Sequence, residues 1–299
     1  MATMPVPRSD GAAPEPERRW WAQLRRDRAG MTGLAVLSLI VAAAIVGPVV
    51  TSQDPFQPNL QETFLPPGSG HVLGTDQLGR DLLARVVAGA RASLLSGLAA
   101  LAVSLAFGVP AGLVAGYSGG RWDDVVMVAV EILMSFPGVL LAFLAIAVLG
   151  PGQQNVVLAV GLASTPVFAR LVRGSALAVR EQEYVMAAVA LGATPARVAV
   201  RHVLPGCLAP IVVIAVLRLG TTIVTIAGLG FLGMGGDPAR PEWGAMLSQG
   251  QEFLRRAPHI ALVPGGAMLL TVLSVNLFGD AVADALNPRV LSWRTHRGG

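Results

Sequence analysis

Few residues in this sequence could do catalytic chemistry, and they lie far apart. The basic side chains are 22 arginines and no lysine, so the chain lacks the P-loop lysine that contacts the phosphates of ATP. The histidines, at positions 71, 202, 259 and 296, occur singly, and no two have metal-ligand spacing. The one cysteine, Cys207, excludes an internal disulfide. Because no His-Glu-x-x-His helix is present either, the sequence predicts neither an enzyme nor a cofactor on this chain.

The longest stretch after residue 90 that could not cross a bilayer covers residues 173–205, which we call the charged segment. It holds four arginines and two glutamates between strongly apolar stretches. These charges make the segment unsuited to crossing a bilayer. The charged segment has two interpretations: a structured docking element, or an ordinary polar loop between membrane helices.

The local pattern of the charged segment predicts a helix, a turn and a second helix. Good helix formers fill residues 176–191, and Gly192 follows where a helix C-terminus favours positive φ. Thr194 is placed to accept a backbone N–H as a side-chain N-cap. The second helix begins with a proline at its first position, which favours helix initiation. It is expected to cover residues 195–203 and to end before Pro205.

Composition places the whole chain in the membrane. Of its 299 residues, 53% are hydrophobic and only 13% charged, with a mean hydropathy of +0.61, whereas a soluble domain has about a quarter charged residues. The sequence therefore predicts an all-α integral membrane protein with six transmembrane helices and a helix-turn-helix loop. The expected spans are about 31–50, 92–117, 125–150, 156–172, 206–232 and 260–279.

The distribution of arginines predicts the orientation of the chain. With the N-terminus inside, the inner segments hold fifteen arginines and the outer segments six. A cytoplasmic N-terminal tail (1–30, partly disordered because of its prolines), the charged segment and a cytoplasmic C-terminal tail (293–299) are therefore expected on the inner side. A secretory signal is the alternative for the first apolar stretch, but twenty apolar residues exceed the usual 7–15 or so of such signals.

The spacing within the charged segment resembles the "EAA" loop of bacterial ABC importer permeases. The matching residues are Ala187 and Ala188, Gly192 four residues later, and Leu204 and Pro205. In that family the loop docks onto a cytoplasmic ATPase subunit and couples it to the membrane part.

Two positions of the charged segment depart from that pattern. Met186 stands where the family has its name-giving glutamate, and His202 stands where isoleucine is usual. The resemblance implies that Glu183, three residues before Met186, could supply the acidic contact instead.

A second match lies in the polar stretch between the first two spans. Residues 73–81 read Leu-Gly-Thr-Asp-Gln-Leu-Gly-Arg-Asp and resemble the extracytoplasmic loop of the second permease of dipeptide, oligopeptide and nickel importers. A short amphipathic helix is expected from about Asp81, with an ion pair between Asp81 and Arg85 one turn later. The resemblance extends over about residues 31–292, through further matches at 116–120, 131–137 and 276–289.

This resemblance implies one half of the membrane part of an ATP-driven importer in the bacterial cell membrane. The implied partners are a second, related permease, two ATPase subunits (or a homodimer of one), an extracytoplasmic solute-binding protein and the lipid bilayer, with no nucleic acid. ATP and Mg would be bound by the ATPases. A channel or secondary transporter, and a membrane enzyme, are the other function classes. A channel or secondary transporter needs no capped helix-turn-helix on its inner face. A membrane enzyme needs clustered polar or metal-binding residues at one depth, and the sequence shows none.

Two charged residues fall within the apolar spans. Glu131 lies in the third expected span and Arg218 in the fifth, where a charge is costly unless it faces a partner or an aqueous cavity. The two could form a buried ion pair, or Arg218 could border the translocation pathway. A fixed positive charge there favours di- or oligopeptides, which carry a carboxylate, over nickel as the solute.

Overall fold

A computed structural model describes residues 24–51, 53–68 and 70–286 of the chain. Within these residues the regular elements are helices, and the only β pairing is an isolated bridge between Thr75 and Asp81. The order of elements is α2 (Arg28–Val50), η1 (Leu60–Glu62), α3 (Leu82–Ser118), α4 (Gly120–Met134), α5 (Gly138–Leu149), α6 (Gln153–Arg180), α7 (Glu183–Ala190), α8 (Pro195–Val198), the π-helix η2 (Ala199–Val203), α9 (Leu204–Phe231), α10 (Trp243–Gln251) and α11 (His259–Leu286).

The described part of the chain contains five helices long and apolar enough to cross a membrane, or six when α4 and α5 count as one broken span. The all-α membrane fold is thereby confirmed. α4 and α5 meet at an angle of 92° around Pro137, which lacks the N–H needed to continue a helix. We call this bend, residues 133–139, the elbow.

Several helices differ in length from the expected spans. α3 has 37 residues, so the expected amphipathic helix and second span form one continuous helix. α2 begins at Arg28, where Asp27 caps it by accepting from the N–H groups of Ala29 and Gly30. α11 continues to Leu286, seven residues beyond the expected span. The expectations for residues 1–23 and for the 293–299 tail lie outside the described residues.

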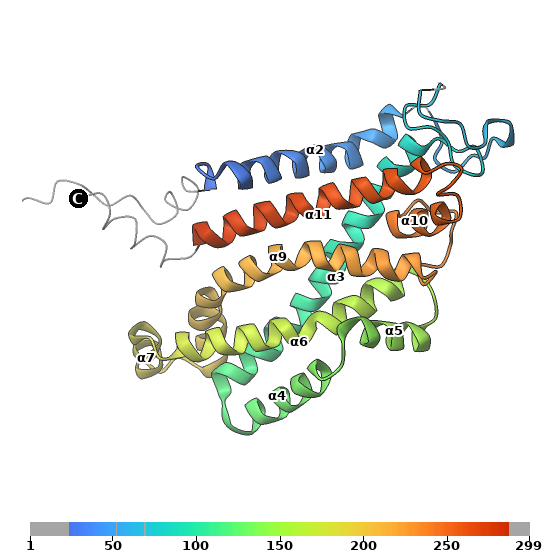
Figure 1. Cartoon of the computed structure of the whole chain (residues 1–299). Helices are drawn as coiled ribbons and strands as arrows, with labels where there is room; N and C mark the ends of the chain where they lie inside the picture. Colours follow the sequence, from blue (N-terminus) through green and yellow to red (C-terminus); the bar gives the residue numbers. More distant parts are fainter. Residues whose placement is uncertain (1–23, 52, 69, 287–299) are drawn as a thin grey trace, which may run out of the picture.

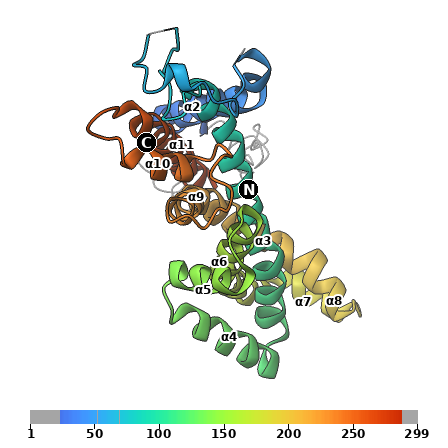
Figure 2. The ribbon, with the colours of Figure 1, turned by 90° about the vertical axis from the view of Figure 1, so that its right-hand side faces the viewer.

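The helices pack in a flat bundle (Figures 1 and 2). α2, α11 and α9 lie next to one another, and α3 crosses the bundle to pack mainly against α6. α4 and α5 lie on the side away from α2. The start of α2, the end of α11 and the short helix α7 all lie at one end of the bundle (Figure 1), and the loop after α2 lies with α10 at the other.

Small residues allow α3 and α6 to approach closely. Gly108, Gly112 and Gly116 recur every four residues on α3, and a Cβ at Gly116 would lie 2.6 Å from the Arg173 carbonyl oxygen. Ser104, one turn before Gly108, donates to the carbonyl of Gly161 on α6 at 2.8 Å. Small residues at this spacing are a common basis of helix packing in membranes, and here they fix α6, which leads into the charged segment.

Candidate functional site

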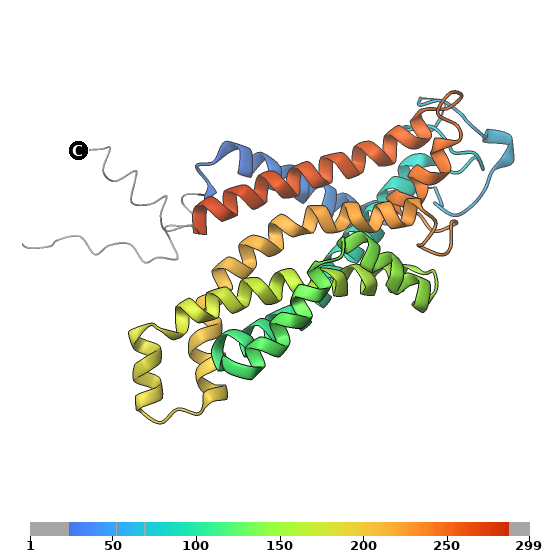
Figure 3. The same ribbon diagram turned by 60° about the horizontal axis from the view of Figure 1, so that its bottom comes forward.

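The charged segment projects beyond the ends of the neighbouring helices as two short helices (Figure 3). The expected single helix over 176–191 is wrong, because α6 runs to Arg180 and α7 starts anew at Glu183. Gln182 between them is extended, with ψ 144°. The bend turns α7 back so that Val185 is buried against the bundle, a contact that a straight continuation of α6 would lose.

Gly192 ends α7 in the left-handed conformation, with φ +82°. Its N–H donates to Val189 at 2.9 Å, and the N–H of Ala193 donates to Ala188 at 3.2 Å. These two bonds form a Schellman motif, which satisfies the last carbonyls of a helix. The predicted conformation of Gly192 is therefore confirmed. A Cβ at Gly192 would meet no heavy atom within 4 Å, so the requirement for glycine comes from φ alone.

The start of the second helix agrees only partly with expectation. Pro195 occupies the first turn of α8, but Thr194 makes no side-chain capping bond. The expected end before Pro205 is also wrong. α8, the π-turn Ala199–Val203 and α9 follow one another without a break over 37 residues, and this stretch bends where the π-turn leads into α9 (Figures 1 and 3). A π-turn uses wider i→i+5 bonds, such as Leu204 N–H to Ala199, and so it admits the proline ring without ending the helix.

Buried apolar side chains hold the charged segment against the bundle. Val185 of α7, Val198 of α8 and Val203 pack in one cluster with Val172 of α6 and Leu113 of α3. The Tyr184 hydroxyl also donates to the His202 carbonyl at 3.2 Å, which joins α7 to the π-turn. The two arms of the segment therefore form one body with the ends of α6 and α9.

The outward surface of the charged segment is apolar with an acidic edge. Met186 and Val189 are about half exposed, and Leu191 is 88% exposed at the tip. Glu183 and Ala187 are exposed as well, Ala188, His202 and Leu204 are partly exposed, and Pro205 is exposed. A shallow hollow beside Met186 is lined by Tyr117 and Arg180, among others. Sequence reasoning missed Leu191, although its position before the helix-ending glycine indicates an exposed residue.

Arg218 lies midway along α9, 14 residues after Leu204 and 13 before Phe231. It borders a cavity of about 280 Å³ between the elbow, α5, α6 and α9. None of the ion pairs among the described residues joins Arg218 to Glu131, so of the two alternatives for Arg218 the ion pair is not formed. Glu131 is exposed on α4, which packs against α3 and α6, and Arg218 faces the cavity instead.

An ion pair that sequence reasoning missed fixes α4 to α6. Arg173 contacts Asp123 through two hydrogen bonds. Arg180, the last residue of α6, donates to the Gly116 carbonyl at 3.0 Å. Both arginines lie in the part of α6 that begins the charged segment. The signal available in the sequence was the acidic pair at 123–124, which follows a helix-breaking Gly-Gly after two residues.

The matched stretch 73–81 forms a compact polar cluster at the opposite end. Asp76 accepts from Arg80 Nε at 2.7 Å and lies 3.3 Å from Arg85 Nε. The predicted Asp81–Arg85 pair is wrong, because Asp81 caps α3 by accepting from the N–H of Ala84. Asp81 also accepts from His71 at 2.8 Å, and this bond raises the pKa of His71 above its usual range.

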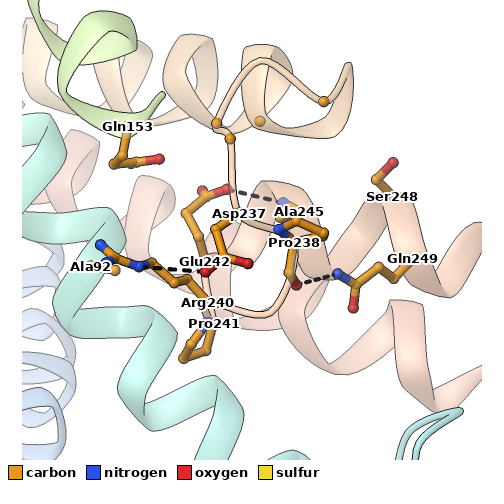
Figure 4. A pocket seen from close by; sticks show the side chains of 14 residues that line it. Ala92, Gln153, Asp237, Pro238, Arg240, Pro241, Glu242, Ala245, Ser248 and Gln249 are labelled. Atoms are coloured by element: carbon orange, nitrogen blue, oxygen red, sulfur yellow. Dashed lines mark hydrogen bonds and ion pairs between the residues drawn. The ribbon is translucent and has the colours of Figure 1, made fainter. Parts of the chain in front are cut away.

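A pocket of about 190 Å³ lies beside this cluster, between the start of α6 and the loop before α10 (Figure 4). Glu242 is 5% exposed and caps α10 by accepting from the N–H groups of Gly244 and Ala245. Burial raises the pKa of Glu242, although the two N–H groups oppose the rise. Gln153 faces the pocket from α6 (Figure 4). Among the described residues, no group of three His, Cys, Asp or Glu side chains could hold a metal ion.

Comparison with known proteins relates this arrangement to a transport family. Residues 108–292 match the family model "Binding-protein-dependent transport system inner membrane component". Residues 16–67 match the "N-terminal TM domain of oligopeptide transport permease C".

Full-length relatives agree with the family models. The chain is 40% identical to a dipeptide transport system permease protein of Alkalihalophilus pseudofirmus, covering 96% of this chain and 95% of the relative. It is 41% identical to a glutathione transport system permease protein of Pectobacterium atrosepticum, covering 98% and 97%.

A solved structure supports the fold. The MetNI methionine ABC transporter, described as inward facing, matches with a TM-score of 0.56 at 20% identity, covering 68% of this chain and 96% of that one. At this identity the likeness concerns the fold alone. Together with the two family models and the full-length relatives, it leads to one conclusion: the chain belongs to the binding-protein-dependent transport system inner membrane components, the multi-pass permeases of ABC importers.

Proposed function

We propose that this permease imports di- or oligopeptides, in a pair with a second, different permease, and that its charged segment docks onto an ATPase subunit. The observation that carries the coupling role is the unbroken helical stretch from Pro195 to Phe231, which contains α8, the π-turn and α9. It begins four residues after Leu191 at the tip of the charged segment and contains Arg218 in the cavity wall. A displacement of the second arm would reach the cavity wall through continuous helical backbone.

The surface of the charged segment suits a protein partner. An exposed apolar centre with a charged edge is typical of interface cores and rims. Here Met186, Val189 and Leu191 supply the apolar centre, and Glu183 supplies the edge. The proposal assigns contact roles to Glu183, Met186, Ala187, Ala188 and Gly192 on the first arm, and to His202, Leu204 and Pro205 on the second.

The orientation is part of the proposal. The start of α2 and the end of α11 lie at the same end of the bundle as α7 (Figure 1), and most arginines lie on the segments at this end. Under the positive-inside rule this end is cytoplasmic. Both termini and the docking surface would then face the ATPases, and the polar cluster at Asp76 would face the solute-binding protein.

The peptide substrate is supported by the names of the relatives. Those reported above are named for dipeptide and glutathione transport, and neither name supports the nickel alternative. The cavity at Arg218 carries a positive charge, which is unfavourable for a metal cation and favourable for a carboxylate.

Purification and transport together test this function. The chain is tagged in its source cells and purified in mild detergent, and we expect an ATPase and a second permease to co-purify. The purified complex in proteoliposomes, supplied with the solute-binding protein, should take up radiolabelled dialanine only when ATP is present on the ATPase side. Uptake driven by an ion gradient without ATP would contradict the proposal and favour a secondary transporter.

A further inference from the structure

The chemistry of the central cavity is concentrated in one side chain. Arg218 is the only charged residue in α9, and its side chain is exposed rather than packed. Three arginines elsewhere have carboxylate partners: Arg173 contacts Asp123, and Arg80 and Arg85 contact Asp76. Within the described parts of the chain, no carboxylate lies within ion-pair distance of Arg218. A mid-membrane guanidinium without a carboxylate requires an anionic partner from elsewhere or an aqueous environment.

The walls of the cavity show which partner fits. Ser164 on α6 and Thr225 on α9 line it together with Arg218. The Thr225 hydroxyl donates to the Thr221 carbonyl at 2.8 Å, so its oxygen is left to accept. The Ser164 hydroxyl makes none of the hydrogen bonds recorded for the described residues and remains able to donate. A guanidinium with a nearby hydroxyl donor is suited to a carboxylate, which accepts through two oxygens.

The rest of the cavity lining is mostly apolar. It includes Leu133, Met134 and Phe136 at the elbow, and Val139 on α5. The volume of about 280 Å³ is near the lower end of the range of about 300–1,000 Å³ for small-molecule sites. A ligand with a carboxylate at one end and an apolar side chain beside it would match both the polar and the apolar part of this lining.

We infer that Arg218, assisted by Ser164, binds the C-terminal carboxylate of the peptide during passage, with the elbow contacting its last side chain. This inference rests on the proposed function and adds a selectivity for peptides with a free C-terminus. The competing explanation is that Arg218 pairs with a carboxylate of the second permease. In that case Arg218 would have a structural role, and its replacement would affect the uptake of peptides with a free or an amidated C-terminus equally.

The test compares trialanine with trialanine amide, which lacks the terminal negative charge. ATP-dependent uptake of each is measured in proteoliposomes for the wild-type complex and for the Arg218→Gln and Arg218→Lys complexes. The same binding protein is used throughout, so that its own preference cancels when the ratio of the two rates is compared between the wild type and each variant. We expect Arg218→Gln to lower trialanine uptake by about tenfold or more, as for loss of a charge-assisted bond, and to change amide uptake by less than about twofold.

Two controls separate the inference from folding defects. Arg218→Lys keeps the charge and should restore part of the preference for trialanine, whereas Arg121→Gln, an exposed arginine in the first turn of α4, should leave the ratio unchanged. Assembly is checked by co-purification of the ATPase. An equal loss of both peptides, or no loss of either, would overturn the inference and leave peptide import standing. A wild-type complex that imports neither peptide would overturn the proposed function and this inference with it.

Discussion

Arg173 and Asp123 join α6 to α4 through two parallel hydrogen bonds, with Nε 2.5 Å from Oδ1 and Nη2 2.7 Å from Oδ2. The side chains are 33% and 17% exposed, so solvent screens the pair only in part. α4 continues into the elbow, and the elbow lines the Arg218 cavity. The pair therefore fixes the position of a helix that forms one wall of that cavity.

Removing either partner of this ion pair should destabilise the chain. We expect Asp123→Ala and Arg173→Ala each to lower the free energy of unfolding by about 1–2 kcal/mol, less than for a fully buried pair. The double variant should cost less than the sum, because its two changes remove the same interaction. SDS-induced unfolding of the purified protein measures this, and strictly additive effects would show that the pair contributes no coupling.

Replacing Gly192 should uncouple the ATPase without preventing insertion into the membrane. Gly192→Val places a β-branched residue at φ +82°, where a non-glycine residue costs about 1–2 kcal/mol or more. The second arm should then be displaced, and the complex should hydrolyse ATP without matching peptide uptake. Because the site has open space around it, Gly192→Asn serves as a matched control that tolerates this conformation. Wild-type uptake by the valine variant would show that the left-handed cap is dispensable.

Local chemistry made the caps and the apolar spans predictable from sequence. Gly192 follows a run of helix formers, and its positive φ agrees with that position. Pro137 indicated a kink, but the 92° angle depends on how α5 packs against α6. The break after Arg180 was missed for the same reason: its cause is the burial of Val185, a tertiary contact.

Pairing partners were the least predictable part of the site. Asp81 and Arg85 have ideal helical spacing for an ion pair, yet Asp81 lies one residue before the helix and caps it. Arg85 turns to Asp76 and donates to the Pro55 carbonyl at 3.0 Å. Glu131 and Arg218 were grouped only because both fall in apolar spans. Sequence position along a helix gives depth in the membrane but not the direction in which the side chain points.

The glycine stripe on α3 should be intolerant of even one added methyl group. A Cβ at Gly112 would overlap the Ala169 carbonyl and lie 2.9 Å from the Val172 Cβ. We expect Gly112→Ala to destabilise the chain by about 1–3 kcal/mol, as overpacking does. Gly228→Ala on α9, where a Cβ meets no heavy atom within 4 Å, is the control and should be neutral or slightly stabilising. Equal SDS-unfolding midpoints for the two variants would contradict close packing of α3 on α6.

The isolated chain should show no peptide uptake. The described walls of its cavity come from the elbow, α5, α6 and α9, and we expect a second permease to complete the pathway. Proteoliposomes containing this chain and the ATPases alone should be inactive, and addition of the second permease during reconstitution should restore ATP-dependent dialanine uptake. Transport by a homodimer of this chain would refute the heterodimer.

His71 should make the stability of the polar cluster depend on pH. Its side chain is 8% exposed and contacts Asp81 at 2.8 Å and Glu62 at 3.4 Å, and the Asp81 bond raises its pKa in the folded state. A raised folded pKa means that the stabilisation is fully present below the unfolded value, about 6.5. It is lost as the pH rises through the higher folded value. The melting temperature should therefore fall between about pH 6 and the upper neutral range.

His71→Asn should flatten this dependence, whereas His259→Gln, whose native histidine side chain contacts the Thr75 carbonyl rather than a carboxylate, should retain it. Thermal unfolding of the three proteins from about pH 5 to 9 measures this. A pH profile in His71→Asn identical to that of the wild type would show that this histidine does not set it.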